Sequence, residues 1–325
     1  MIKILLLFIL AHLMGDFITQ SKYINKNKEI FKNKIYSKGL FIHVLHHICL
    51  TNLLFIIFRE WTFTYFMIIF MVSVIHYIID YVKVTKQDEY IELFKKKDHK
   101  DKYWLQYIFE KRTTYFLADQ FLHIVSIYGL LRLFTLGPAL TDIYNQLGIF
   151  LFAKNLVIDS EVKIISFLIV LILVTYASAY LISAVLADLQ EERLQEESAA
   201  AVELDEKSEA IKTIKESFSL MKSDLVIDES YEFDDEKYTL KVQYQQYSNP
   251  DNNSRGKYIG ILERLLITIF VVLNIYQGLV LLGAIKTVSR FKQFEDKNFA
   301  EYYLLGTLLS LIAGITLGLL IKRII

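Results

Sequence analysis

Apolar blocks of about 20 residues, separated by clusters of charged residues, recur along this 325-residue chain. A helix of about 20 apolar residues spans the ~30 Å hydrocarbon core of a bilayer. Inside that core the backbone polar groups must bond to one another, which favours helices. We therefore expect an all-α integral membrane protein with about seven spans. The expected spans lie at about residues 3–20, 38–58, 61–83, 113–135, 162–187, 259–284 and 302–321.

The first block resembles the core of a signal peptide, because Leu5 to Leu13 follow Lys3 closely. It lacks a convincing small-residue cleavage site and continues into His12 and Asp16. We therefore interpret it as a retained span. A further apolar stretch at 143–157 is too short to cross comfortably, so we expect it to lie along the interface or to dip in and return.

Lysine and arginine in short loops mark the cytosolic side of a membrane protein. The loops 21–37 and 84–112 are rich in lysine, whereas the turn between the second and third spans carries Arg59 and Glu60. Both basic loops are therefore expected in the cytosol, with the N-terminus outside. The polar segment that follows the fifth span should then be intracellular.

One basic loop conflicts with this topology. It carries Lys286, Arg290, Lys292 and Lys297, and it would lie outside if 259–284 crossed the membrane once. A re-entrant hairpin there, or a true crossing by the short apolar stretch, would restore the rule. Both alternatives are compatible with the sequence.

The changes in composition along the chain predict four segments. The first is an N-terminal four-helix bundle, the third is a small acidic cytosolic insertion, and the last consists of membrane helices. Within the insertion, Leu189 to Met221 favours a helix and the alternation from Tyr238 to Tyr244 predicts a strand. Its excess of acidic residues argues against nucleic-acid binding. The segments are 1–137 (the bundle), 138–187 (an interfacial segment and the fifth span), 188–257 (the insertion) and 258–325.

Two features of the C-terminal helices suggest local roles. Gly314 and Gly318 form a GxxxG pair, which is typical of a closely packed helix face. Glu263 and Arg264 are expected to form a local ion pair or to anchor the helix at the membrane boundary.

Histidine and aspartate pairs in the first four spans share a spacing of four residues. Residues at i and i+4 lie on the same face of a helix, so each helix presents two such groups together. On the topology above, all four pairs fall within roughly two turns of the cytosolic boundary. We therefore expect them to meet at one depth. The pairs are His12 and Asp16, His43 and His47, His76 and Asp80, and Asp119 and His123.

Carboxylates inside a membrane are costly, at about 2.5–3.5 kcal/mol each near the helix centre. Such groups therefore point to a function. Imidazole and carboxylate are ligands of zinc, iron and manganese, and facing helices of a bundle can hold two metals. We expect one or two divalent ions, with zinc first and manganese or iron as alternatives. The expected ligands are His12, Asp16, His43, His47, His76, Asp80, Asp119 and His123.

Interpretations of the same residues that involve no metal stay open. The pairs could form a hydrogen-bond network that holds the helices together, or they could relay protons or ions. His46 alone is expected to face headgroups or a neighbouring helix. Lys83 follows Asp80 by three residues and could offer a cation to an anionic substrate, or it could be an ordinary boundary anchor.

The motifs as a set resemble the domain-of-unknown-function family 3307 of bacterial and phage membrane proteins. They comprise residues 11–17 with Gln20, His43 and His47, residues 76–80 with Lys83, and residues 119–123. Residues 256–264, 290–291 and 299–307 are similar to longer members. The family has no settled activity, so the resemblance implies a multi-pass location in a bacterial cytoplasmic (inner) membrane without naming a reaction. A more distant similarity is to bacterial inner-membrane proteins described as metal-dependent hydrolases.

The preferred hypothesis is a membrane-embedded, metal-dependent hydrolase that acts near the cytosolic face. Metal-bound water would be the nucleophile, and Asp16, Asp80, Asp119 and Lys83 would assist catalysis. A substrate reached at that depth would be a lipid or a lipid-linked molecule, with phosphoester cleavage favoured if Lys83 participates. The alternatives are a proton- or ion-coupled transporter or channel, and a membrane sensor or scaffold. A homo-oligomer is compatible with the sequence.

Overall fold

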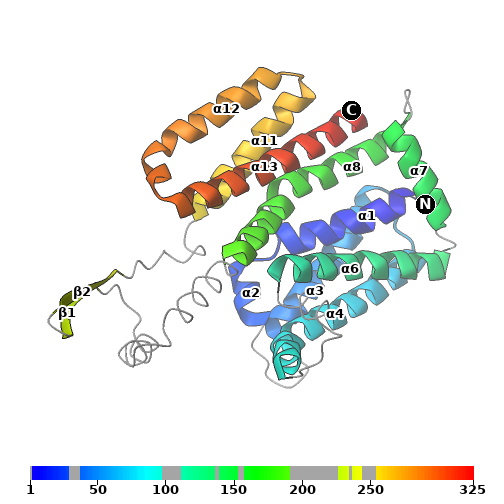
Figure 1. The fold of residues 1–325 in the computed structure, drawn as a ribbon. Coiled ribbons are helices and arrows are strands. Elements are labelled where there is room, and N and C mark those ends of the chain that lie inside the picture. The colour runs from blue at the N-terminus through cyan, green and yellow to red at the C-terminus, as the bar shows by residue number, and fades with distance from the viewer. Residues whose placement is uncertain are drawn as a thin grey trace. The chain divides into compact units, whose positions relative to one another are not determined.

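The computed structural model describes residues 2–28, 37–96, 111–135, 139–152, 157–190, 226–233, 236–243 and 254–325. Contacts divide the chain into two compact units, residues 1–188 with 260–325 and residues 189–259. The division of the first unit into the predicted segments stays a prediction. Its helices are shown in Figure 1. They are α1 (Ile2–Leu13), η1 (Met14–Ile18), α2 (Lys22–Lys28), α3 (Lys38–Ile57), α4 (Phe63–Lys96), α6 (Arg112–Thr135), α7 (Leu140–Phe152), α8 (Ser160–Ile172), η3 (Leu173–Ala177), α11 (Ser254–Val272), α12 (Tyr276–Ser289), η5 (Phe291–Glu295) and α13 (Lys297–Ile324).

Among the described residues, five helices are long and apolar enough to cross a membrane. They overlap five of the predicted spans and identify the chain as a helical membrane protein. The predicted first span corresponds to α1 followed by η1, a π-helical turn, which together run from Ile2 to Ile18. The five helices are Lys38–Ile57, Phe63–Thr85, Arg112–Thr135, Ser160–Gln190 and Lys297–Ile324.

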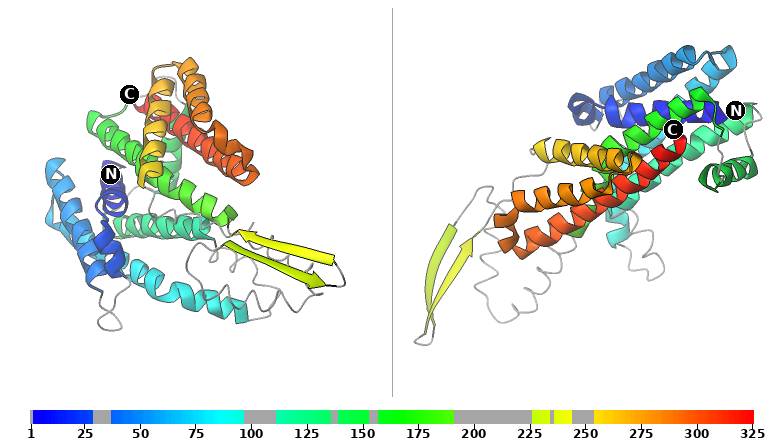
Figure 2. Two further views of the ribbon diagram at one scale, coloured as in Figure 1. Left: turned by 90° about the vertical axis from the view of Figure 1, so that its left-hand side faces the viewer. Right: turned by 90° about the horizontal axis from the view of Figure 1, so that it is seen from above.

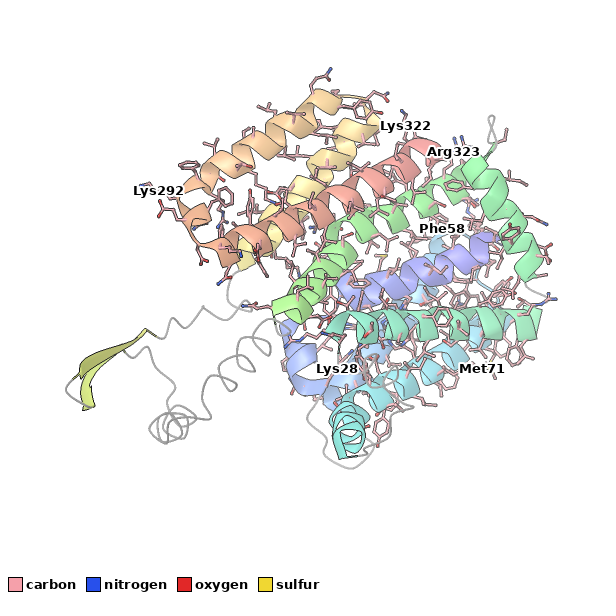
Figure 3. The ribbon with its side chains drawn as sticks, viewed as in Figure 1. Lys28, Phe58, Met71, Lys292, Lys322 and Arg323 are labelled. Carbon is pink, nitrogen blue, oxygen red and sulfur yellow. The ribbon has the colours of Figure 1, made fainter. Side chains whose placement is uncertain are left out.

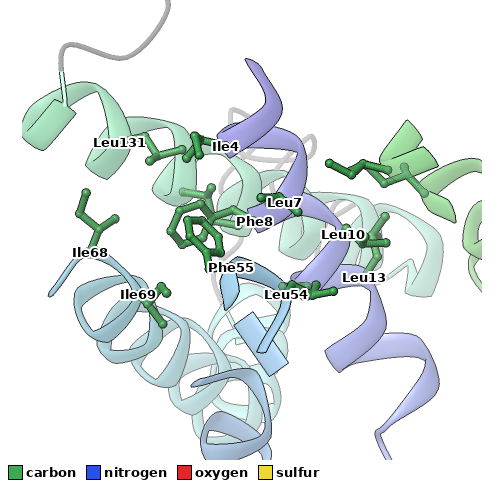
Figure 4. Packing of buried hydrophobic residues seen from close by; sticks show 14 of the residues in the cluster. Ile4, Leu7, Phe8, Leu10, Leu13, Leu54, Phe55, Ile68, Ile69 and Leu131 are labelled. Atoms are coloured by element: carbon green, nitrogen blue, oxygen red, sulfur yellow. The ribbon is translucent and has the colours of Figure 1, made fainter. Parts of the chain in front are cut away.

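Helix α1 lies at the centre of the N-terminal bundle. It packs against α3, α6 and α8, and in Figure 1 it runs between α6 and α8. A helix that is apolar on all sides is stable when it is enclosed by others, and Leu7 and Leu10 are fully buried. Figure 4 shows the apolar core around it, where the rings of Phe8 and Phe55 meet edge to face at 5.0 Å.

Polar contacts mark the two ends of the bundle. At one end Lys3 donates to the carbonyl of Phe58 at 3.2 Å and pairs with Glu60 and Glu161. At the other end the carboxylate of Asp188 accepts hydrogen bonds from the backbone N–H groups of Arg112 and Thr113, at 2.8 and 2.9 Å. Asp188 thus caps α6 from a helix that is distant in sequence. We refer to these as the Lys3 end and the Asp188 end; Arg112, the last residue of the second basic loop, lies at the latter.

Helix α7 stays at the Lys3 end. It follows α6, and the carbonyl of Phe150 accepts a hydrogen bond from Arg323 near the end of α13. Its 13 residues span about 20 Å as a helix, which is less than the hydrocarbon core. The structure therefore favours the predicted interfacial position over a crossing.

The predicted single span at 259–284 is wrong. The helix breaks at Asn274, which has a positive φ of 59°, and the chain turns back. Lys286 pairs with Glu263 at 2.7 Å, so the end of α12 lies beside the early part of α11. A Cβ atom at Gly278 would lie 2.8 Å from the Phe270 ring. Asparagine adopts this left-handed conformation more readily than other non-glycine residues, which explains the hairpin.

The hairpin resolves the conflict with the positive-inside rule. Helix α11 runs alongside α13, since a Cβ at Gly314 would meet Ile267 and one at Gly318 would meet Val271. The predicted close-packed GxxxG face is therefore confirmed. Figure 2 shows α11, α12 and α13 side by side. Because α12 returns, the basic loop before α13 lies opposite the Lys3 end, as the rule requires.

The second unit contributes a two-stranded antiparallel hairpin among its described residues. Strand β1 (Val226–Phe233) pairs with β2 (Glu236–Gln243), with Val226 opposite Gln243. The strand predicted around Tyr238 is confirmed, and the hairpin qualifies the predicted all-α class. The helix predicted from Leu189 to Met221 lies outside the described residues beyond Gln190.

Candidate metal centre

The π-helical turn η1 carries Asp16 into the bundle. Such turns hold one more residue than an α-helical turn and occur frequently at functional sites. Gly15 lets this turn approach α3 closely, since a Cβ atom there would lie within 2.6 Å of three ring atoms of His47. Thr19 donates to the carbonyl of Gly15 at 3.0 Å and so satisfies one backbone group of the turn. The chain therefore places Asp16 directly against the histidines of α3.

One oxygen of Asp16 faces three imidazoles. Its Oδ1 atom lies 3.1 Å from Nε2 of His47, 3.3 Å from Nε2 of His43 and 3.8 Å from Nε2 of His76. The Nε2 atoms of His43 and His76 are themselves 3.1 Å apart. All four ligand atoms lie within 4.8 Å of one another, and the three histidines are buried. We name this set the Asp16 group.

These separations match the coordination sphere of a metal. Four ligands at about 2.0–2.1 Å from a zinc ion would lie about 3.3 Å apart in a tetrahedron. Without an ion, three imidazole nitrogens compete for one carboxylate oxygen that has two lone pairs. A cation at their centre would accept all four lone pairs. The residues therefore fit a divalent metal.

A second group shares His76. It consists of His76, Asp80 and His123, whose ligand atoms also lie within 4.8 Å of one another. Asp80 Oδ2 lies 3.8 Å from Nε2 of His76, and Asp80 Oδ1 lies 3.8 Å from Nε2 of His123. Asp80 also approaches His43, at 3.4 Å. The two groups are thus continuous, as a centre with two ions would require.

His123 is oriented by its own helix. Its Nδ1–H donates to the backbone carbonyl of Asp119 at 2.9 Å, which leaves the lone pair on Nε2. That Nε2 atom is buried and has no hydrogen-bond partner among the residues that the structure describes. A hydrogen bond on one ring nitrogen that fixes the other for a metal is typical of histidine ligands.

Two lysines approach the site through carboxylates. Lys28 pairs with Asp80 at 2.8 Å and Lys83 pairs with Asp119 at 2.7 Å. Gln120 donates to both Asp16 and Asp119, at 3.2 and 3.3 Å. The Lys28 side chain is 12% exposed and that of Lys83 is 35% exposed, so Lys83 is the more accessible cation.

A small cavity adjoins the histidines. Its volume is about 20 Å³, and it is lined by His12, His47, His76 and His123 together with Thr51, Ser73 and Ser126. Such a volume has room for about one water molecule. Phe8, Ile69 and Ile127 also line it, so the cavity ends against the apolar core of the bundle.

Residues 4–151 match the model of a protein family described as a protein of unknown function, DUF3307. Residues 4–151 therefore belong to the DUF3307 family. No curated protein and no solved structure matches the chain.

The DUF3307 match confirms the resemblance seen in the N-terminal motifs. The matched segment contains every residue of both groups. The similarity of the last 70 residues or so to longer members lies outside it and stays a prediction.

The eight predicted ligands do converge within the DUF3307 segment, at one depth of the bundle. Six of them form the two groups, and their role as ligands stays a prediction. His12 stands beside the groups, with Nε2 3.6 Å from Asp16 Oδ2 and its ring stacked on His123 at 4.8 Å. The side chain of Asp119 pairs with Lys83, and its backbone carbonyl accepts a hydrogen bond from His123. His46 belongs to neither group.

Lys28 is a residue beside the ligand groups that the sequence did not reveal. In the sequence it is one lysine among several in a basic loop. Helix α2 brings it to Asp80 by folding back on α3, where a Cβ at Gly39 would lie within 2.6 Å of backbone atoms of α2. Ser37 strengthens this contact by donating to the carbonyl of Asn27 at 2.7 Å. Figure 3 labels Lys28 at this position.

Proposed function

We propose that the protein is a metal-dependent hydrolase embedded in the membrane, which acts near the cytosolic face on a lipid or lipid-linked phosphoester. The observation that carries the proposal is Asp16 Oδ1 within 3.1–3.8 Å of three imidazole Nε2 atoms. The Asp16 group would hold the first ion, and Asp80 with His123 would complete a site for a second. We take zinc as the first candidate, with manganese and iron as alternatives.

When bound, a divalent ion acts as a Lewis acid and lowers the pKa of a coordinated water to about 7. The protein's own groups then position the substrate and move protons. Asp80 faces His43, His76 and His123, so with a single ion in the Asp16 group it would be placed to accept a proton beside the ligands. Asp119 orients His123 through its backbone and Lys83 through its side chain.

The charge balance favours an anionic substrate. Three carboxylates (Asp16, Asp80 and Asp119) against two ammonium groups (Lys28 and Lys83) give a net charge of −1 when the histidines are neutral. One divalent ion changes this to +1. A buried net positive charge is unfavourable in a low-dielectric medium, so an anion such as a phosphate group would be attracted. Lys83, the more exposed cation, would meet it first.

The level of the site favours a lipid substrate. The four residue pairs lie toward the end of the bundle that carries the basic loops, where lipid headgroups meet the protein. We therefore propose that a phosphate bound there would belong to a lipid headgroup; the apolar residues that line the other side of the cavity are compatible with this. A bacterial cytoplasmic membrane is the proposed location, and it rests on the family resemblance alone.

An ion or proton pathway is the second candidate, because histidine, serine and threonine residues line one cavity. A pathway needs polar groups on through the rest of the span. Toward the Lys3 end, the described helices contribute Ile4, Leu7, Phe55, Ile68 and Leu131 to a buried apolar cluster instead. This arrangement favours the hydrolase.

The test uses the full chain in lipid nanodiscs, loaded in turn with zinc, manganese and iron. Release of phosphate from phosphatidic acid, a lipid monoester, is compared with cleavage of phosphatidylglycerol, a diester. We expect metal-dependent cleavage that Asp16→Asn abolishes and His46→Ala retains. Metal-loaded protein that cleaves neither lipid, but passes ions in liposomes until His76 is replaced by alanine, would establish the pathway instead.

A further inference from the structure

Arg264 is a buried cation in the apolar C-terminal helices. It is 3% exposed, and it does not form the local ion pair expected with Glu263, since Glu263 binds Lys286. Its guanidinium donates instead to two backbone carbonyls of η3, with Nε 2.7 Å from the oxygen of Val174 and Nη2 2.9 Å from that of Thr175. Arg264 thus lies buried against the fifth span, and a charged group buried among membrane helices is a candidate for a function.

The turn that Arg264 binds is itself irregular. The π-helical turn η3 interrupts the fifth span. Side-chain hydroxyl groups donate hydrogen bonds to backbone carbonyls in this turn and just before it. Thr175 donates to the carbonyl of Leu171 at 2.7 Å, and Ser178 donates to that of Leu173 at 2.6 Å. The planar guanidinium of Arg264 presents two N–H donors in a fixed geometry to two carbonyls at once, whereas a lysine ammonium has no such fixed geometry.

The two π-helical turns lie against each other. η3 contacts η1, and η1 carries Asp16, whose Oδ1 atom faces the three imidazoles. A second link runs through aromatic rings, with Phe17 against Phe116 at 6.0 Å and Phe116 against Tyr180 at 4.7 Å. The shape of η3 therefore bears on the position of Asp16.

We infer that Arg264 is a positioning residue for the metal site: by bonding Val174 and Thr175 it fixes the turn that supports Asp16. The inference rests on the proposed metal site. It gives the C-terminal helices, which lie outside the segment that matches the family, a role in tuning the N-terminal centre. Groups that orient metal ligands from outside the coordination sphere typically change affinity by about 10–100-fold.

The decisive variant is Arg264→Lys, which keeps the buried charge and removes the planar guanidinium. Zinc affinity of the full chain is measured by competition with a chelator, and the absorption spectrum of cobalt-loaded protein reports ligand geometry. We expect affinity to fall about tenfold and the spectrum to change. Lys286→Gln is the matched control: it breaks the ion pair to Glu263 on the same hairpin and should leave both measurements unchanged.

The outcomes separate this inference from the proposed function. Wild-type protein that binds no metal refutes the metal site itself. Wild-type protein that binds metal, together with an Arg264→Lys variant of unchanged affinity and spectrum, refutes the positioning role alone. If Arg264→Lys is not recovered folded, Ser178→Ala decides, because it removes one bond from the same turn. A folded Ser178→Ala variant with wild-type affinity and spectrum would overturn the inference.

Discussion

Replacing Gly15 by alanine perturbs the candidate metal centre by a single added methyl group. In Gly15→Ala the new Cβ would lie within 2.6 Å of three ring atoms of His47. Ordinary carbon contacts begin near 3.5 Å, so the ring or the turn must move by about 1 Å. Nε2 of His47 and Oδ1 of Asp16 are 3.1 Å apart, so a shift of about 1 Å would separate two expected ligands of one ion.

The expected result is a loss of metal affinity of at least about tenfold, with a cost in folding stability of about 1–3 kcal/mol from overpacking. Metal affinity is measured by chelator competition and stability by thermal unfolding in detergent. Gly129→Ala is the matched control, because a Cβ at Gly129 on α6 meets nothing within 4 Å. It should bind metal normally and be as stable as the wild type or more so, since alanine favours a helix over glycine. A Gly15→Ala variant with wild-type affinity would refute the geometry of the site.

Three further perturbations have distinct expected results. Lys28→Met removes a cation 2.8 Å from a carboxylate of the site, so divalent-metal affinity should rise about tenfold, or about 1.4 kcal/mol. Lys38→Met, at an exposed lysine, should leave the affinity unchanged. A fall in the affinity of Lys28→Met would contradict the charge balance. Asp188→Ala removes the cap of α6; unfolding should become easier by about 1 kcal/mol with metal stoichiometry unchanged, and equal melting temperatures would argue against the cap. Gly314→Leu places a side chain where even a Cβ atom would lie 2.7 Å from Ile267, so the melting temperature should fall. Gly283→Ala on the open face of α12 should have no such effect. A Gly314→Leu variant as stable as the wild type would contradict the close packing.

The sequence predicted the convergence of the site because the necessary information is local. A spacing of four residues places two groups on one helix face, and the basic loops fix which end of each helix lies at which side. Together they predict that His43, His76 and His123 meet at one depth. The pattern does not specify which atoms pair, because that depends on the rotation of each helix in the bundle.

The features that the sequence did not reveal depend on tertiary contacts. Lys28 reaches Asp80 because α2 docks on α3 at Gly39. Arg264 binds carbonyls of a π-helical turn, and nothing in the local pattern around Val174 marks such a turn. The hairpin break was more accessible to prediction, since Asn274 is a polar residue with a left-handed preference inside an apolar run.

Elemental analysis of purified protein tests the central claim most directly. His76 belongs to both groups of ligands, whereas His46 belongs to neither. After exposure to zinc, manganese and iron and removal of excess ion, we predict about one or two equivalents of metal in the wild type and in His46→Ala, and far less in His76→Ala. Wild-type protein that retains no metal under these conditions, or a His76→Ala variant that retains as much as the wild type, would contradict the account.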